Sequence, residues 1–455
     1  MLFLSKDVSS IIFIAISSLL ISLAVVYYPA GLPVLLAVFF VCVLGALVLK
    51  NPLWFFYFLA LSKINLDSVK LYHYGSRGPD LKYALSLDGL TTVILLSGTL
   101  FYFIRHRAGS RLFGYPAVKP FILFLLICLF GLGFSPERMI GLRHFINYLN
   151  YFLIYLFCFI LLDSPEKNRK MICAILFSSL VPLWVGFYQA ARPAVNIFTP
   201  GYNRIYALTP HPNAYAYYLV AIAMFILTWL FYYKPLRVVL PLFILFIAVI
   251  ISLLLTYTRG AWLAMALGIA VFMLILRDRL KQRPVLMLIL TLGGGALILY
   301  FILSLRGLER ISAFSDVKSD SLWTRVLLWR VYFKEFVKHP LIGQGLASCN
   351  LISQKNIGYL YEPHNDYLKL LVESGIFALC AYLGIIFSLL KFLFYKYKNY
   401  FSRPESILAA GAVSVIFCFA LGQSMDNLFN ADTVFSYFWF FIGVSCAFLK
   451  TSEVK

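Results

Sequence analysis

A single histidine stands among polar residues in YEPHNDYLKLLVESG, residues 361–375, within a chain that is otherwise strongly apolar. A neutral imidazole can accept a proton near neutral pH, so His364 is a candidate general base. Pro363 stops a preceding helix from continuing, and Asn365 or Asp366 can cap a new helix. The alternative is a structural histidine that hydrogen-bonds its own helix end or interfacial water.

The same stretch has a helical spacing of apolar residues. His364, Leu368, Leu371 and Gly375 are 4, 3 and 4 residues apart, which predicts that they share one helix face. Gly375 has no side chain, so another helix could approach closely at that point. The spacing therefore predicts a histidine at the rim of a membrane domain, above a packed seam.

Two arginines could bind an anion. Arg259 lies in LLLTYTRGAWLAMALG, residues 253–268, where a very short turn joins two apolar runs. A guanidinium beside a helix N-terminus suits a phosphate group, and Leu263 lies on the same helix face. The alternative for Arg259 is an interfacial anchor. Arg204 lies in a loop rich in turn residues, and the alternative there is a solvated loop charge.

Three further residues are candidates for contact with a substrate. Asn213 follows Arg204 in the sequence and could cap the next apolar run. Arg143 begins another run from the same predicted side, where an interfacial charge is the alternative reading. Arg325 lies in the helix-like stretch SLWTRVLLWRVYFKEFVKHP, residues 321–340.

The sequence predicts no metal site and no cofactor. Asp316 and Asp320 are four residues apart, but no third acid converges on them, so a solvated helix face is expected. The eight cysteines have neither metal-ligand nor disulfide spacing, and seven of them fall within apolar runs. We find no P-loop, GxSxG, HExxH or CxxC motif, which disfavours an ATP-driven pump.

The elements that must position these residues are membrane helices. The 455-residue chain is 62% hydrophobic with a mean hydropathy of +0.86, and runs of about 17–20 apolar residues are long enough to cross a bilayer. Because the runs are continuous rather than alternating, the fold class is all-α and polytopic. Twelve to fourteen transmembrane helices are expected, near residues 9–28, 31–49, 51–64, 86–104, 120–134, 145–162, 171–190, 213–233, 237–257, 261–276, 285–304, 375–395, 406–423 and 433–449.

The net charge of +20 could indicate a nucleic-acid partner, but its distribution indicates membrane topology instead. With fourteen spans, one side receives 21 Lys+Arg and 6 Asp+Glu, a net charge of +15. The other side receives 18 Lys+Arg and 13 Asp+Glu, a net charge of +5. The more basic side is expected to be cytoplasmic. The outer segments are then 65–85, 135–144, 191–212, 258–260, 305–374 and 424–432.

The largest outer segment predicts the domain organisation. Residues 305–374 are too long for a bare loop and predict a partly helical cap over the membrane domain. HPLIGQGLASCN, residues 339–350, predicts a tight turn inside that cap. We therefore expect a first transmembrane part over 1–304, a large periplasmic segment over 305–374, and a second transmembrane part over 375–455.

The chain resembles the O-antigen ligase and polymerase superfamily of bacterial inner membranes. The resemblance covers roughly residues 200–395 and rests on R-x-x-x-L from Arg259, H-N-x9-G from His364, R-x-Y-A-L-T-x-x-P-N from Arg204 and the turn PLIGQG at 340–345. The ligase pattern usually continues G-x-x-[GTY], whereas Ala378 stands here. The R-x10-G pattern of some polymerases fails at both arginines, which favours the ligase branch.

The resemblance implies a membrane-embedded glycosyltransferase of the GT-C type that needs neither metal nor nucleotide. The implied donor is a glycan on undecaprenyl pyrophosphate, and the implied acceptor is the lipid A core oligosaccharide. His364 would act as the base, with inversion at the anomeric carbon, and Arg259 and Arg204 would clamp the pyrophosphate. Candidate substrate-binding residues are Asn365, Arg143, Asn213 and Arg325.

Two alternatives stay open at this stage. One is a polymerase of lipid-linked O-antigen or exopolysaccharide repeat units, which would use much the same residues. The other is a flippase or transporter of lipid-linked glycan, which would place charges deep within its spans rather than at the rim. In each case the protein would lie in the bacterial inner membrane, and the enzyme's active site would face the periplasm.

Overall fold

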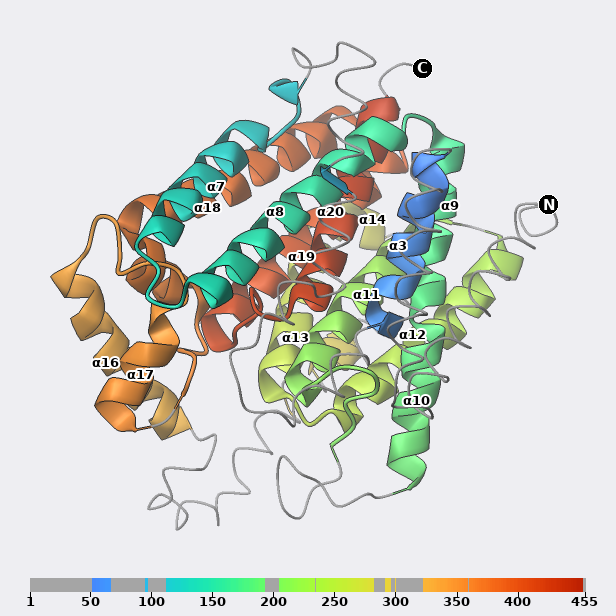
Figure 1. The fold of residues 1–455 in the computed structure, drawn as a ribbon. Helices are drawn as coiled ribbons and strands as arrows, with labels where there is room; N and C mark the ends of the chain where they lie inside the picture. Colours follow the sequence, from blue (N-terminus) through green and yellow to red (C-terminus); the bar gives the residue numbers. More distant parts are fainter. Residues whose placement is uncertain are drawn as a thin grey trace.

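The computed structural model describes residues 51–66, 95–96, 112–192, 204–233, 235–281, 291–295, 299, 322–358 and 360–452. Within these ranges the chain is helical and contains no strand (Figure 1). The helices, in chain order, are α3 (Pro52–Leu66), α7 (Val118–Gly133), α8 (Arg138–Leu161), α9 (Pro165–Ser178), α10 (Leu180–Ala191), α11 (Pro212–Tyr232), α12 (Leu236–Leu255), α13 (Arg259–Ile275), α14 (Arg277–Leu280), α16 (Leu322–Lys338), α17 (Ser348–Ile357), α18 (Asp366–Asn399), α19 (Glu405–Met425) and α20 (Asp432–Thr451).

The described helices confirm an all-α polytopic membrane protein. Seven of them, counting α9 and α10 as one span, are long and apolar enough to cross a bilayer. The shorter apolar helices α7 and α13 lie beside these spans. The predicted spans 9–28, 31–49, 86–104 and 285–304 fall wholly or mainly outside the described residues, so the total of twelve to fourteen stays a prediction.

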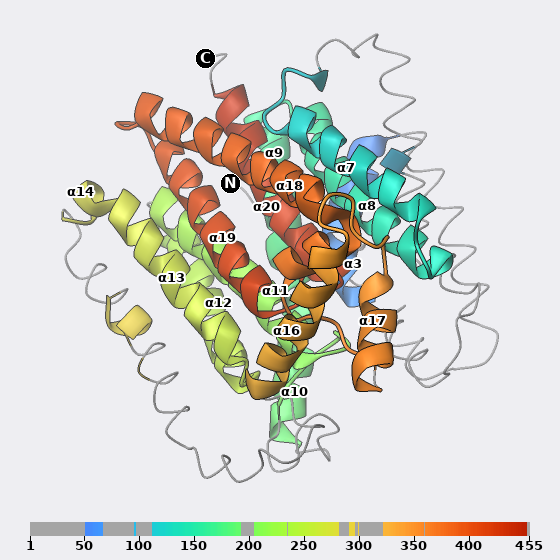
Figure 2. The same cartoon turned by 90° about the vertical axis from the view of Figure 1, so that its left-hand side faces the viewer.

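The core of the bundle lies between α8, α11, α19 and α20, with α12 and α18 nearer the outside (Figure 2). Residues on every side of α20 are buried, as expected of a helix that is apolar all round. Aromatic rings fill the spaces between helices, and Trp439 of α20 contacts Phe121 and Tyr155 at centroid distances of 4.9 and 5.6 Å. This packing gives the outer ends of the helices fixed relative positions.

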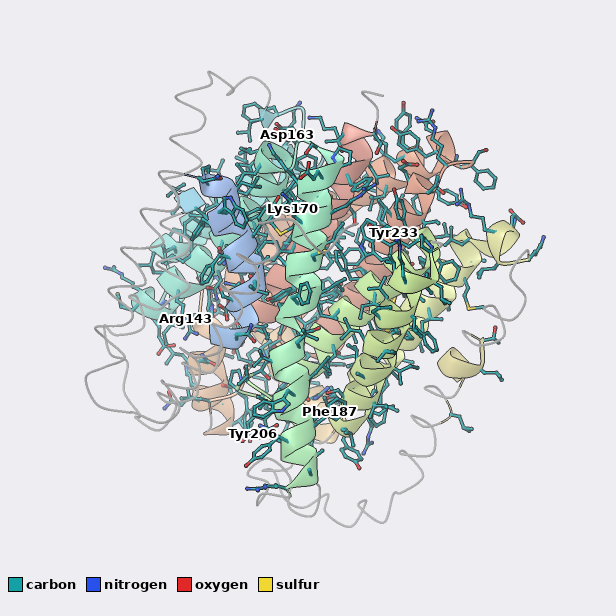
Figure 3. The ribbon with its side chains drawn as sticks, turned by 90° about the vertical axis from the view of Figure 1, so that its right-hand side faces the viewer. Arg143, Asp163, Lys170, Phe187, Tyr206 and Tyr233 are labelled. Atoms are coloured by element: carbon teal, nitrogen blue, oxygen red, sulfur yellow. The ribbon has the colours of Figure 1, made fainter. Side chains whose placement is uncertain are left out.

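The predicted outer segments meet at one end of the bundle. Ser135 Oγ donates to the carbonyl oxygen of Leu346 at 2.7 Å, and Arg204 binds the turn before α13. Basic segments meet at the opposite end, where Arg279 donates to the carbonyl oxygen of Arg403 at 2.7 Å. In Figure 3, Asp163 and Lys170 lie near one end of the α9–α10 rod and Tyr206 lies near the other. Over the described residues these contacts agree with the predicted grouping of the loops, whose assignment to the two sides of the membrane stays a prediction.

The cap is partly helical over its described residues, as predicted. Helices α16 and α17 pack on the first turns of α18 through a small separate core of Leu328, Tyr332, Cys349, Ile352, Leu368 and Val372. Seven of the ten predicted spans within the described residues agree with helices to within two residues. Helices α8 and α9 begin seven and six residues before the predicted starts, and α18 begins at Asp366, nine residues before the predicted start of its span. The predicted domain boundary between residues 374 and 375 falls at a break inside this helix.

The break in α18 lies at Gly375, where φ is +73° and ψ is −175°. The turn PLIGQG packs its backbone against the break: the amide of Ile376 donates to Pro340, and the amides of Gln344 and Gly345 donate to Val372 and Glu373, at 2.8 to 3.0 Å. A Cβ atom on Gly375 would overlap the carbonyl group of Leu341. The partner that approaches this glycine is therefore a cap turn, rather than the helix that the sequence predicted.

Candidate functional site

The position of His364 corrects one expectation. His364 precedes α18 and has a left-handed φ of +48°, so it does not share a helical face with Leu368, Leu371 and Gly375. The cause is the cap: Asn365 is the N-cap, and its side chain accepts a hydrogen bond from the amide of Leu368 at 3.0 Å. An N-cap residue takes non-helical angles, so the residue before it lies outside the helix.

The cap helix α16 holds the backbone of the residues that precede His364. Trp329 Nε1 donates to the carbonyl oxygen of Pro363 at 2.7 Å. Tyr332 Oη donates to the carbonyl oxygen of Tyr361 at 2.5 Å and lies 3.1 Å from that of Cys349. A left-handed conformation is costly for a non-glycine residue and persists where the surroundings fix it. These contacts supply that fixation.

His364 faces Asp426, which follows the end of α19. The imidazole Nδ1 lies 3.3 Å from the carboxylate Oδ1. Partial burial opposes ionisation of Asp426. The hydrogen bond and charge of His364, together with Arg325 and His211, outweigh it and lower the pKa of Asp426 to about 2. An ionised carboxylate can only accept, so this contact favours the proton on Nδ1 and leaves Nε2 as the nitrogen that can act as a base; Asn427 Nδ2 lies farther from Nδ1, at 3.4 Å.

Arg204 is joined to the same carboxylate through Asn213. Arg204 donates to Asn213 Oδ1 at 2.9 Å, and Asn213 Nδ2 donates to Asp426 Oδ2 at 2.7 Å. Hydrogen bonds thus connect His364, Asp426, Asn213 and Arg204 in that order. Arg204 also donates to Thr256 O at 2.9 Å and Thr258 Oγ1 at 3.2 Å. It is therefore a half-buried, oriented cation rather than a solvated loop charge.

Asn213 does not cap α11, contrary to one expectation. His211 is the N-cap, and its Nδ1 accepts from the amide of Asn213 at 3.1 Å. Asn213 is the second residue of the helix, where its side chain is directed to Arg204 and Asp426. His211 therefore has a structural role as the helix cap, and Asn213 connects two charged groups of the site.

The remaining arginines occupy different positions. Arg325 Nη1 donates to the carbonyl oxygen of Met425 at 2.7 Å, directly beside Asp426. Arg259 is exposed at the first turn of α13, next to Thr258, which binds Arg204. Arg143 is partly buried on α8 (Figure 3).

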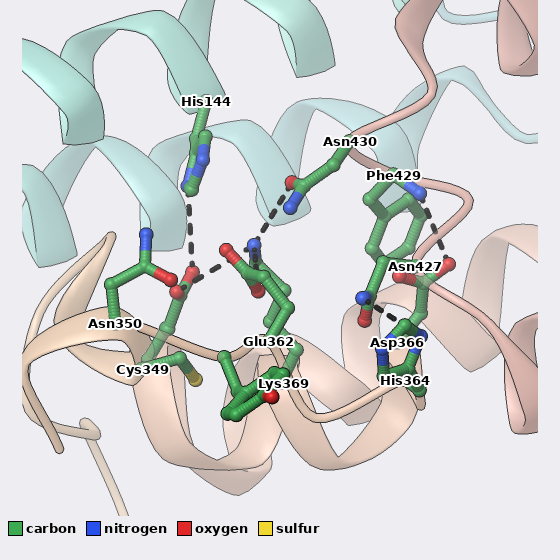
Figure 4. Close-up of polar contacts among 12 residues, drawn as sticks. His144, Cys349, Asn350, Glu362, His364, Asp366, Lys369, Asn427, Phe429 and Asn430 are labelled. Atoms are coloured by element: carbon green, nitrogen blue, oxygen red, sulfur yellow. Dashed lines mark hydrogen bonds and ion pairs between the residues drawn. The ribbon is translucent and has the colours of Figure 1, made fainter. Parts of the chain in front are cut away.

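A second polar cluster lies beside the pair of His364 and Asp426, which we call the dyad (Figure 4). The buried ammonium of Lys369 donates to Glu362 Oε2 at 2.8 Å and to Asn430 Oδ1 at 2.9 Å. It also lies 3.8 Å from the carboxylate of Glu373, whose other oxygen is 3.8 Å from His144 Nδ1. Lys369 thus ties the segment before His364 to the loop that carries Asp426.

A parallel tie runs through Asp366, the first residue of α18. Its Oδ2 accepts from the backbone amide of Phe429 at 3.1 Å, as Figure 4 shows. Together with the contacts of Lys369, this bond sets the distance between the loop 426–430 and the start of α18. The buried contacts of Lys369 with Glu362 and Glu373 are costly unless their geometry is good. Here they help to position His364 and Asp426.

Sequence reasoning missed Asp426, Lys369 and Glu373. Asp426 lies 62 residues from His364, in the short outer segment 424–432, and its signal was the presence of an acid between two spans. Lys369 and Glu373 are four residues apart near the start of an apolar run, a pattern typical of the solvated side of a helix. The described residues contain no cluster of acids, histidines and cysteines fit for a metal ion, and Asp316 and Asp320 lie outside them.

Comparison with known proteins addresses the family. Residues 244–383 match the sequence profile of a family described as O-Antigen ligase. The resemblance to the O-antigen ligase superfamily is confirmed. The matched stretch includes Arg259, His364 and Gly375, and it leaves out Arg204 and Asp426, which the structure brings next to the ligase-like segment.

A curated relative points in the same direction. The ligase-like chain is 23% identical over 326 residues to the ComP-specific O-oligosaccharyltransferase of Acinetobacter baylyi, a match that covers 67% of this chain and 56% of the relative. The chain therefore spans a little more than half of that protein's length. One of the two descriptions names a ligase and the other an oligosaccharyltransferase.

Proposed function

We propose that this protein is a metal-independent glycosyltransferase that moves a glycan from undecaprenyl pyrophosphate to the lipid A core oligosaccharide. The observation that carries the proposal is the connected chain of His364, Asp426, Asn213 and Arg204 at the outer ends of membrane helices. In this proposal His364 is the base and Arg204 is a cation of the same site, and transfer from a pyrophosphate needs both.

In the proposed mechanism His364 Nε2 accepts the proton of the acceptor hydroxyl as its oxygen attacks the anomeric carbon. Asp426 fixes the imidazole orientation and stabilises the positive charge that the ring gains. The bond from the anomeric carbon to the donor phosphate breaks, and the configuration inverts. Pyrophosphate leaves with the electron pair, and Arg204 and Arg259 stabilise its charge.

The other candidate residues take supporting roles in this proposal. Arg325 binds the backbone beside Asp426 and adds positive charge to the same site. Asn213 holds the arginine and the carboxylate in register, and Asn365 serves as the helix cap that places His364 outside α18. Arg143 would contact substrate at a greater distance from the dyad. The site would face the periplasm of the inner membrane, following the positive-inside rule.

One comparison favours a second acceptor class. The Acinetobacter relative is named as an oligosaccharyltransferase specific for ComP. A hydroxyl group on a protein would require the same base and the same clamp as a sugar hydroxyl. The donor chemistry is shared, and only the acceptor differs.

Reconstitution of the purified protein in liposomes with lipid-linked glycan tests the proposal. Three acceptors are supplied in parallel: lipid A core, lipid-linked repeat units and a pilin-type protein. Transfer to lipid A core supports the ligase, growth of the repeat units indicates a polymerase, and labelling of the protein indicates an oligosaccharyltransferase. If no acceptor is glycosylated, or if His364→Ala, Arg204→Ala and Arg259→Ala all retain full activity, the mechanism is wrong.

A further inference from the structure

Helix α16 and the turn after it expose an apolar stripe on the outside of the cap. Phe333, Val337 and Leu341 are 57%, 59% and 57% exposed, and Ile342 is 46% exposed. Phe333, Val337 and Leu341 are spaced by four residues, so they lie along one side of the helix and continue into the turn. We call these four residues the lipid-facing stripe. A contiguous apolar surface of this kind marks a contact with a partner or a membrane.

The position of the turn places the stripe at membrane depth. Leu341 and Ile342 line a cavity of about 670 Å³ together with residues of α7 and α18, among them Leu126, Phe130 and Phe377. Leu126, Phe130 and Phe377 belong to apolar helices, and their side chains are more than half exposed on the outside of the bundle. Side chains that share a cavity with them lie where those helices face hydrocarbon.

The turn is held in this place by backbone hydrogen bonds. Its contacts with the break in α18 join Pro340 to Ile376 and Gln344 to Val372 at 2.9 and 2.8 Å. Gly343 fits directly against the backbone of Glu373, where an added Cβ would come within 2.5 Å. The position of Leu341 and Ile342 beside α18 is therefore built into the fold.

Basic residues border the stripe. Arg330, Lys334 and Lys338 are exposed on α16, and Lys338 pairs with Glu335 at 2.6 Å. Arg330 and Lys334 form no ion pair within the described part of the chain. A helix with an apolar side flanked by basic residues is typical of a segment that lies in the interface and binds anionic lipid.

We propose that α16 and the 339–342 turn lie in the outer leaflet and bind the phosphate groups of anionic phospholipids through Arg330 and Lys334. The apolar stripe enters the hydrocarbon edge, continuous with the lipid-facing sides of α7 and α18. This lipid contact is independent of the glycan that the site transfers. The inner side of the same helix holds the backbone next to His364 through Trp329, so the bound lipid fixes the cap that positions the imidazole.

Photocrosslinking in nanodiscs tests the lipid contact. A benzoylphenylalanine residue is introduced at Val337, at Leu126 as the membrane-facing positive control, and at Lys355 on α17 as an exposed cap control. The nanodiscs contain equal amounts of radiolabelled phosphatidylglycerol and phosphatidylcholine. Lipid capture at 337 comparable to that at 126, with at least fivefold less at 355, is expected. Capture at 337 no greater than at 355 would overturn the proposal.

The charge contribution is tested in the same nanodiscs. In the Arg330→Gln/Lys334→Gln variant, the ratio of phosphatidylglycerol to phosphatidylcholine captured at 337 should fall at least fivefold, because each basic residue near an anionic surface changes affinity by about that factor. A Lys355→Gln variant is the matched control and should leave the ratio unchanged. An unaltered ratio in the double variant, in protein that elutes as a single folded species, refutes binding through these two residues.

Discussion

Replacement of Asp426 by asparagine removes the carboxylate that orients His364 and keeps the shape of the side chain. If the amide oxygen takes the place of Oδ2, it can still accept from Asn213, whereas the bond from the backbone amide of Asn427 to Oδ1 is lost. The amide can present its NH2 group to His364 Nδ1, which favours the tautomer with the proton on Nε2. A protonated Nε2 cannot accept the proton of the attacking hydroxyl.

The structure gives the size of the effect. The pKa of Asp426 is lowered from 3.8 to about 2, and each pKa unit corresponds to about 1.4 kcal/mol. The favourable interactions of the ionised carboxylate therefore exceed its cost of burial by about 2 kcal/mol. A hydrogen bond to a charged group contributes about 1.5–3 kcal/mol, which agrees. We expect kcat to fall about 30- to 100-fold in Asp426→Asn, with little change in KM.

The assay is the initial rate of glycan transfer in proteoliposomes across pH 5.5–8.5. Because the pKa of Asp426 is about 2, the carboxylate is ionised throughout this range, so its own titration should not appear in the wild-type profile, and the loss of activity should be evident at neutral pH. The control is Asp278→Asn, an exposed acid at the opposite end of the bundle, which should keep the wild-type rate. A rate in Asp426→Asn within threefold of wild type would refute the role of the dyad.

Three other predictions concern stability. Lys369→Met leaves Glu362 and Glu373 without their buried cation, so the free energy of unfolding should fall by about 3–5 kcal/mol and transfer should be lost. The exposed control Lys391→Met should leave thermal unfolding unchanged. Gly375→Ala should destabilise by about 1–3 kcal/mol, because only glycine tolerates the backbone angles of the break; proteolysis of the 339–345 turn should accelerate, and an unchanged digestion rate would contradict this reading. The pKa of Asp426 is lower in the folded state than the unfolded value of 3.8, so the stabilisation by its carboxylate is present above about pH 4 and is lost as the pH falls toward 2. The thermal unfolding temperatures of wild type and Asp426→Asn should therefore converge over that interval. A constant difference between them would argue against the ion pair.

The sequence by itself determined the properties that depend on local physics. Apolar runs of sufficient length must cross the bilayer as helices, and the distribution of Lys and Arg sorts their connections between two sides. The type and position of His364 and the arginines marked the outer end as the place for chemistry. The helix cap at Asn365 was also predictable, because an asparagine side chain can satisfy the first free amides of a helix.

Tertiary structure alone decided which groups meet. Asp426 contacts His364 across 62 residues, and Asn213 joins that carboxylate to Arg204 across 213 residues and then across nine. The break at Gly375 accommodates the 340–345 turn, whose backbone packs there, and the Asn365 cap starts the helix at Asp366 and leaves His364 outside it. Local spacing assigns a helical face to a residue, but a contact between distant segments can remove that residue from the helix. The packing of α16, α18 and α19 therefore decides that His364 faces a carboxylate rather than the seam that its spacing predicted.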